Sequence, residues 1–135
     1  MQNIDIASLL RDALTLSGCN DKQIGNFDGH STIELELANL PAINIGVVDD
    51  GLWFWSGLIE SSNMLLAHRS EDLLRFLMRG CVFARTEQMQ LVEANGMLEV
   101  RVLLADSAYA NAESLADTVD AYLAALTTLC DLVRQ

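Results

Sequence analysis

The sequence predicts an α+β fold that combines an antiparallel sheet with three helices. Alternating apolar and polar residues over positions 33–37 and 43–47 predict half-exposed strands. Asn95-Gly96 between two apolar runs predicts a β-hairpin. Apolar residues three and four apart predict helices at both ends of the chain. We therefore expect the order helix, three-stranded antiparallel meander, helix, β-hairpin and C-terminal helix, in a single domain over residues 1–135.

The first helix is predicted between Asp5 and Gly18. The Asp5 carboxylate can accept the free N–H groups of the opening turn, and glycine is favoured where a helix ends. Apolar residues between these two positions recur at helical spacing. They are Ile6, Leu9, Leu10, Ala13 and Leu16.

Three strands are predicted next, over residues 30–37, 43–47 and 52–58. Pro41 marks the break between the first two, because proline cannot donate a hydrogen bond to a sheet. Asp49-Asp50-Gly51 predicts a tight turn into the third strand. Short turns make consecutive strands antiparallel neighbours, which gives a meander.

The second half of the chain predicts a helix, a hairpin and a last helix. The middle helix is expected to begin at Ser70, because the two acids that follow would lie at the positive end of its macrodipole. Its residues before Gly80 are apolar over more than one face, so we expect burial on two sides. The hairpin pairs residues 88–92 with residues 98–104, and the last helix covers residues 112–133 with one continuous apolar face.

The composition is that of a globular, strongly acidic protein. Of 135 residues 51% are hydrophobic, and 19 acids against 8 bases give a net charge of -11 at pH 7. Nucleic acids and anionic membranes bind through lysine and arginine, so neither is an expected partner. The 3 cysteines are widely separated and odd in number, which predicts neither a disulfide framework nor a zinc site. The N-terminal segment lacks the basic region of a signal peptide, and no apolar run is long enough for membrane insertion, so we expect a cytoplasmic location.

The sequence offers one candidate catalytic group, formed by Asp28, His30 and Ser31. Asp28 and His30 share a face of an extended segment, whereas Ser31 points away, so nothing fixes the geometry of a hydrolase triad. Neither a glycine-rich phosphate loop nor a metal-binding motif occurs, and we expect no cofactor and no metal. Cys81 lies in an apolar context and is expected to be an inert core thiol.

Aromatic residues and arginines point instead to binding surfaces. Trp53 and Trp55 share one face of the third predicted strand, and Phe54 lies on the other face. One face must line the core, and the other needs a covering helix or a partner. Arginines also cluster around the middle helix, which is typical of protein interfaces but equally of a solvated surface. They are Arg69, Arg75, Arg79 and Arg85.

A series of ordered motifs spans the chain. They are Ser17-Gly18-Cys19, Asp28-Gly29-His30-Ser31-Thr32-Ile33, Leu40-Pro41-Ala42-Ile43, Trp53-Phe54-Trp55, Gly80-Cys81-Val82-Phe83-Ala84-Arg85 and Asn95-Gly96. With these motifs in the same order of elements, the whole chain resembles the small acidic chaperones of type III secretion systems, specifically the InvB-like invasion-protein chaperones of subclass IB.

The resemblance implies a bacterial, cytoplasmic homodimer that has no enzymatic activity and works without ATP. Such a chaperone binds the N-terminal, non-globular segment of one or more secreted effectors and keeps them stable and ready for export. The segment wraps around the dimer in extended form, adds to sheet edges and sets apolar side chains into grooves. The resemblance adds the ATPase of the secretion system as a further candidate partner. The chain's negative charge favours basic effector segments.

The resemblance also implies which residues form the two interfaces. By position, the dimer interface around the middle helix would contain Leu73, Phe76, Leu77 and Phe83. The effector grooves would lie on the first helix and the meander, where strand parity predicts one apolar face. That face would combine Leu10, Leu14, Ile33, Leu35, Ile43, Ile45, Trp53 and Trp55. Parity alone leaves open which face of the sheet meets the effector.

Three other functions stay open at the level of sequence. The chain could be an α+β sensor or adaptor with a small molecule between sheet and helix, for which a closed apolar pocket of several hundred cubic ångströms would speak. It could be a small hydrolase that uses His30 and Asp28. It could also be a structural subunit whose apolar faces are all internal to a dimer.

Overall fold

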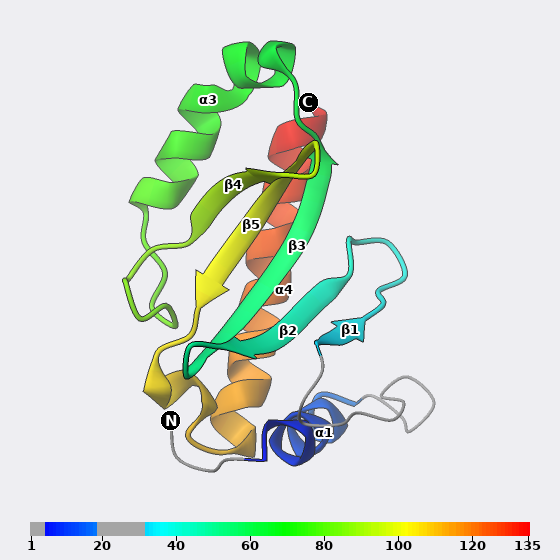
Figure 1. The fold of residues 1–135 in the computed structure, drawn as a ribbon, viewed down its shortest axis with the longest axis vertical. Helices are drawn as coiled ribbons and strands as arrows, with labels where there is room; N and C mark the ends of the chain where they lie inside the picture. The colour runs from blue at the N-terminus through cyan, green and yellow to red at the C-terminus, as the bar shows by residue number, and fades with distance from the viewer. Residues whose placement is uncertain (1–4, 19–31) are drawn as a thin grey trace.

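The computed structural model describes residues 5–18 and 32–135, and it confirms the predicted α+β class and order of elements (Figure 1). The helices are α1 (Ile6–Leu16), α3 (Asn63–Met78) and α4 (Ala112–Arg134), with a short 3₁₀ helix η1 (Asp106–Tyr109) before α4. The strands are β1 (Ile33–Leu35), β2 (Ile43–Val48), β3 (Gly51–Glu60), β4 (Gln90–Ala94) and β5 (Met97–Leu103). They form an antiparallel sheet in the order β1-β2-β3-β5-β4.

Local sequence signals set the start of α1 and the two tight turns of the sheet. The Asp5 carboxylate accepts a hydrogen bond from the Ser8 N–H at 3.0 Å, as expected of an N-cap. Asp49 and Asp50 join β2 to β3 with φ values of 50° and 61°. Asn95-Gly96 joins β4 to β5 with φ values of 54° and 79°. Left-handed values at both central residues are those of two-residue hairpin turns, so both predicted turns are confirmed.

The start of the middle helix was wrongly predicted. Ser62 is the N-cap of α3 and accepts a hydrogen bond from the Leu65 N–H at 3.0 Å, whereas Ser70 lies inside the helix. The expected burial on two sides is also wrong, because Leu73 is the one buried residue of α3. The helix packs against α4 along one side and leaves its other sides to solvent or a partner.

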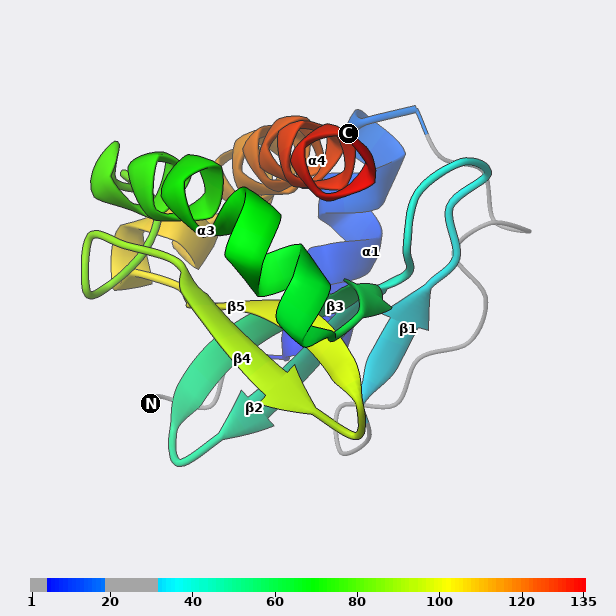
Figure 2. The same cartoon turned by 90° about the horizontal axis from the view of Figure 1, so that it is seen from above.

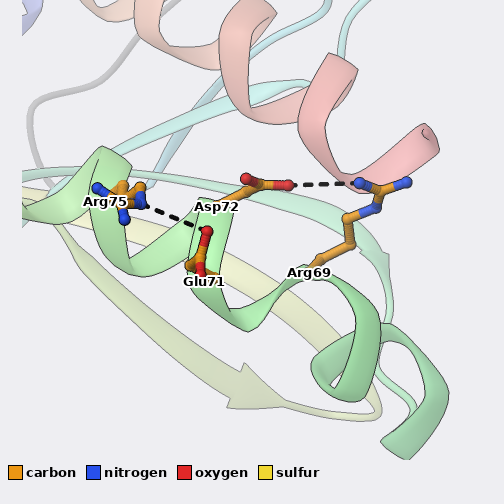
Figure 3. A network of polar contacts seen from close by, with 4 residues as sticks. All are labelled: Arg69, Glu71, Asp72 and Arg75. Carbon is orange, nitrogen blue, oxygen red and sulfur yellow. Dashed lines mark hydrogen bonds and ion pairs between the residues drawn. The ribbon is translucent and has the colours of Figure 1, made fainter.

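The acids that suggested a helix start at Ser70 have a different role in α3. The Glu71 carboxylate pairs with the Arg75 guanidinium at 3.4 Å, and the Asp72 carboxylate pairs with that of Arg69 at 3.3 Å (Figure 3). Pairs three and four residues apart stabilise a helix from within, by a few tenths of a kcal/mol each (about 0.2–0.5). In α3 the acidic pair therefore belongs to ion pairs within the helix and does not mark its start.

The core lies between one face of the sheet and the helices α1 and α4. Figure 2 shows these helices on the same side of the sheet, and the described part of the chain places no helix on the opposite side. The Phe54 ring of β3 packs edge-on against the Tyr122 ring of α4, with centroids 5.4 Å apart and planes at 86°. One face of the sheet is thus buried, and the other is uncovered.

A buried polar contact joins the sheet to α4 across this core. The hydroxyls of Ser56 on β3 and Tyr122 on α4 are 2.8 Å apart, and both residues are at most 1% exposed. Burial raises the pKa of the Tyr122 hydroxyl far above its usual value, so this group stays protonated and one hydroxyl always donates to the other. Since a buried hydroxyl without a partner is costly, the contact fixes where α4 crosses β3.

We predict that Tyr122→Phe lowers the free energy of unfolding by about 1–2 kcal/mol, because the buried Ser56 hydroxyl loses its partner. The double variant Ser56→Ala/Tyr122→Phe should recover most of this loss, since it leaves no unsatisfied group. Urea denaturation followed by circular dichroism measures both. A double variant that is as unstable as the sum of the single variants would show that the hydrogen bond is not the cause.

Candidate functional site

The pairing of β2 with β3 decides which side chains face the core. Ile45 is opposite Phe54, and both are buried, at 1% and 0% exposure. Asn44 is opposite Trp55, and Gly46 is opposite Trp53. Since cross-strand partners share a face, both tryptophans lie on the uncovered face of the sheet. The sequence prediction that they lie opposite to Phe54 is confirmed.

The eight residues predicted to form one effector-binding face do not share a face. Six of them belong to the core and are at most 7% exposed, whereas Trp53 and Trp55 are partly exposed on the other side. The reason is the two-residue turn at Asp49 and Asp50, which pairs odd-numbered residues of β2 with even-numbered residues of β3. The six buried residues are Leu10, Leu14, Ile33, Leu35, Ile43 and Ile45.

The uncovered face carries a trough of about 340 Å³. Its lining comes from four strands and mixes two indole rings with an aliphatic, an amide and a guanidinium side chain. We refer to it as the tryptophan trough; it is lined by Val48, Trp53, Trp55, Gln90 and Arg101. Two partly exposed indoles side by side on an uncovered sheet face make the trough a candidate binding surface.

A glycine shapes the floor of the trough. A Cβ atom at Gly46 would lie only 3.1 Å from Cη2 of Trp55, so the indole extends across β2 at the place where β2 has no side chain. The Asn44 amide donates a hydrogen bond to the Trp55 carbonyl at 3.3 Å on the same pair of strands. The position of the indole therefore depends on the sequence of β2 as much as on that of β3.

One ion pair lies at the trough. The Arg101 Nε and Nη2 atoms both donate to Oε2 of Glu99, at 2.9 and 2.7 Å. The Glu99 side chain is 14% exposed and that of Arg101 is 40% exposed. The sequence analysis did not single out either residue, although in the run from Met97 to Leu103 they alternate with buried residues, which indicates the uncovered face.

A second apolar surface lies on and after α3. We refer to Leu74, Met78 and Val82 as the α3 patch; their exposures are 57%, 69% and 99%. Beside it is a groove of about 320 Å³ whose lining includes Phe83, Met89 and residues of α4. The sequence analysis missed these three residues, because it treated the helix as buried.

The structure places the four residues predicted for the dimer interface near this groove but mostly inside the protomer. Leu73 is 3% exposed, so its side chain is not on the surface. Phe76, Leu77 and Phe83 are partly buried and pack against the core, and two of them, Phe76 and Phe83, line the groove. Phe76 and Phe83 contribute part of the groove lining, and the α3 patch supplies exposed apolar side chains beside it.

No group suited to catalysis stands out in the described residues. Asp28, His30 and Ser31, the candidate trio, lie outside them. Burial raises the pKa values of the Cys81 and Cys130 thiols, which lowers the fraction of reactive thiolate. Within residues 5–18 and 32–135, three metal-ligating side chains nowhere come together, and the helices there are too short or too polar to span a membrane.

Comparison with known proteins defines the class. The fold matches a chain of the ExoU–SpcU complex from the type III secretion system of Pseudomonas aeruginosa, with a TM-score of 0.55 and 17% identity over 96% of this chain and 95% of that chain. Two relatives named surface presentation of antigens protein SpaK, from Salmonella typhimurium and Salmonella typhi, are each 46% identical over 104 residues, which is 77% of either chain. The protein is a type III secretion chaperone and not an enzyme.

The particular family follows from the sequence itself. Residues 18–95 match the model of the Invasion protein B family. This chain belongs to that family, which confirms the resemblance seen in its motifs.

We predict that Gly46→Ala displaces the Trp55 indole, because the new methyl group would lie within 3.3 Å of two ring atoms. The partly exposed ring can swing outward, so the loss of stability stays near 1 kcal/mol while the tryptophan emission moves to longer wavelength. Gly57→Ala is the matched control on β3, where a Cβ atom would meet only Met97 at an ordinary 3.5 Å. Equal emission spectra for the two variants would contradict the prediction.

Proposed function

We propose that the protein binds the non-globular, N-terminal segment of one or more type III effectors in the bacterial cytoplasm, without ATP, and that the tryptophan trough is part of the binding surface. The observation that carries this proposal is the position of Trp53 and Trp55, two large side chains left partly exposed on the uncovered face of the sheet. The segment stays unfolded and ready for export because its apolar residues are covered by the chaperone.

The physical argument rests on what an unfolded segment can offer. Such a segment presents apolar side chains and unpaired backbone groups, and it loses conformational entropy when it binds. Aromatic platforms recover this cost because each indole can bury a large area with few rotatable bonds. The sheet also ends in two edge strands, β1 and β4, whose outer backbone groups have no strand partner in the described chain. They support the proposed addition of an effector strand to a sheet edge.

The location of the trough favours a polypeptide over a small molecule. A sensor or adaptor would hold its ligand between the sheet and a helix, enclosed on most sides. The trough lies instead on the side of the sheet that the described helices leave uncovered (Figure 2). A long segment can follow such a surface beyond the trough itself.

The trough is tested by Trp53→Ala and Trp55→Ala, each combined with an effector segment produced in the same cells. Truncating a buried aromatic anchor typically costs about 2 kcal/mol, so each variant should bind roughly thirtyfold more weakly in isothermal titration calorimetry. Trp55→Phe, which keeps an aromatic ring, should restore part of the affinity. Met64→Ala removes an exposed apolar side chain at the start of α3, outside the trough, and is the control. Unchanged affinity in both alanine variants would remove the trough from the binding surface.

We also propose that the chaperone is a homodimer formed through the α3 patch. A fully exposed Val82 beside an apolar groove gives a projection and a recess on the same face, as a two-fold interface requires. Charge supports this choice, since α3 holds two arginines and two acids, and Arg79 follows as its C-cap, although the net charge of the chain is -11. Two acidic protomers therefore repel one another least along α3. Family resemblance alone supports contact with the ATPase of the secretion system.

Val82→Glu tests the dimer, because it would bury a carboxylate in an apolar interface. We expect the variant to sediment as a monomer in analytical ultracentrifugation at concentrations where the unmodified protein is a dimer. Leu16→Glu adds the same charge at an exposed position on α1 and should leave the dimer intact. If both variants remain dimeric, the α3 patch is not the interface.

A further inference from the structure

The charges at the tryptophan trough differ from those of the rest of the protein. The net charge of the chain is -11 at pH 7. At the middle of this face, however, the charged residues Glu99 and Arg101 are one acid and one base in direct contact. Gln90, Arg101, Trp55 and Asn44 form one row across the sheet, and Glu34 of β1 continues it to the edge. The centre of the face is therefore neutral, and further acids lie only toward its rim.

The two charged groups at this centre and the Asn44 amide already have partners within the protein. Glu99 receives two hydrogen bonds from Arg101, and the Asn44 amide binds the Trp55 carbonyl. Polar groups that are already paired lose little when a partner excludes water from them, whereas an unpaired carboxylate would lose a great deal. The face is thus prepared for burial under an apolar surface.

Resting on the proposed function, we propose that the Glu99–Arg101 pair makes the tryptophan trough selective for uncharged, apolar stretches of an effector segment. Arg101 is the specificity-determining residue, because its guanidinium offsets the charge of the Glu99 carboxylate. That carboxylate is only 14% exposed, so water alone would screen its charge poorly. The net charge of the chain attracts bases to the surface in general, but the trough itself gives a base no partner. Apolar stretches of the effector segment therefore bind in the trough, and its lysine and arginine side chains bind toward the rim of the sheet face.

The consequence is a change of selectivity when Arg101 is removed. Arg101→Gln keeps a hydrogen-bond donor near Glu99 but leaves the carboxylate uncompensated beside the indoles. The trough then repels anions, attracts cations and loses affinity for apolar segments. Glu99→Gln has the opposite effect on ions, and the double variant Glu99→Gln/Arg101→Gln is neutral again.

The chain contains 2 tryptophans and both line the trough, so their fluorescence reports its charge directly. We compare quenching by iodide and by caesium at pH 8 in the full-length protein without effector. The iodide-to-caesium ratio of quenching constants should fall about twofold in Arg101→Gln, rise in Glu99→Gln and return to its starting value in the double variant. Arg75→Gln changes the net charge equally but breaks the 3.4 Å pair with Glu71 on α3, away from the trough, and it should leave the ratio unchanged.

These measurements decide the electrostatic part of the proposal even if one variant fails to fold. Should Arg101→Gln be unfolded by circular dichroism, Glu99→Gln against the double variant gives the same comparison with the opposite sign. The proposal is overturned if the iodide-to-caesium ratio of Arg101→Gln equals that of Arg75→Gln, or if the ratio of Glu99→Gln equals that of the unmodified protein.

A peptide experiment tests the selectivity itself. Overlapping peptides from the N-terminal segment of a secreted effector are titrated, and the tightest binder without lysine or arginine is compared with a copy in which lysine replaces one apolar residue. The unmodified protein should bind the neutral peptide about tenfold more tightly than the lysine peptide. In Arg101→Gln this ratio of affinities should be smaller by about fivefold or more. An equal preference for the neutral peptide in Arg101→Gln and Arg75→Gln overturns the proposed selectivity. If no peptide binds the unmodified protein, the proposed function fails. The quenching ratios still test separately whether the Glu99–Arg101 pair keeps the trough neutral.

Discussion

The register of the β2–β3 hairpin is the constraint on which the rest of the structure depends. A two-residue turn at Asp49 and Asp50 places Ile45 opposite Phe54 and Asn44 opposite Trp55. A shift by one residue would exchange the faces of every side chain on one of the strands. Either the tryptophans of β3 would then enter the core, or the apolar residues of β2 would be left in water. The position of the candidate binding surface is therefore a result of turn geometry.

The two faces of the sheet are held by different interactions. On the covered face, α4 crosses β3 where Phe54 meets Tyr122 and where the Ser56 hydroxyl finds its buried partner. On the uncovered face, Gly46 makes room for an indole, and Glu99 and Arg101 satisfy one another. Polar groups are paired on both faces, but only one face keeps large apolar side chains accessible. This difference separates the part that gives stability from the part proposed to bind.

A strongly acidic chaperone needs places where its charge does not prevent association. The tryptophan trough and the α3 patch are two such places, and they are built from different residues. In the trough a carboxylate is cancelled by a guanidinium, and along α3 the arginines match the acids through pairs such as Glu71 with Arg75. High net charge keeps the rest of the surface apart from other molecules. Local neutrality then decides where contact is favourable.

The sequence by itself determined the elements and the family. Asp5 at the first helix, the two hairpin turns and the alternation on either side of Trp53-Phe54-Trp55 are local signals, and local physics is enough to interpret them. Tertiary structure decided which strand faces pair, where α3 begins, that Val82 is exposed, and that Glu99 and Arg101 pair beside the trough. Each of these depends on contacts between residues far apart in the chain, and periodicity within one segment contains no information about the register or packing of another.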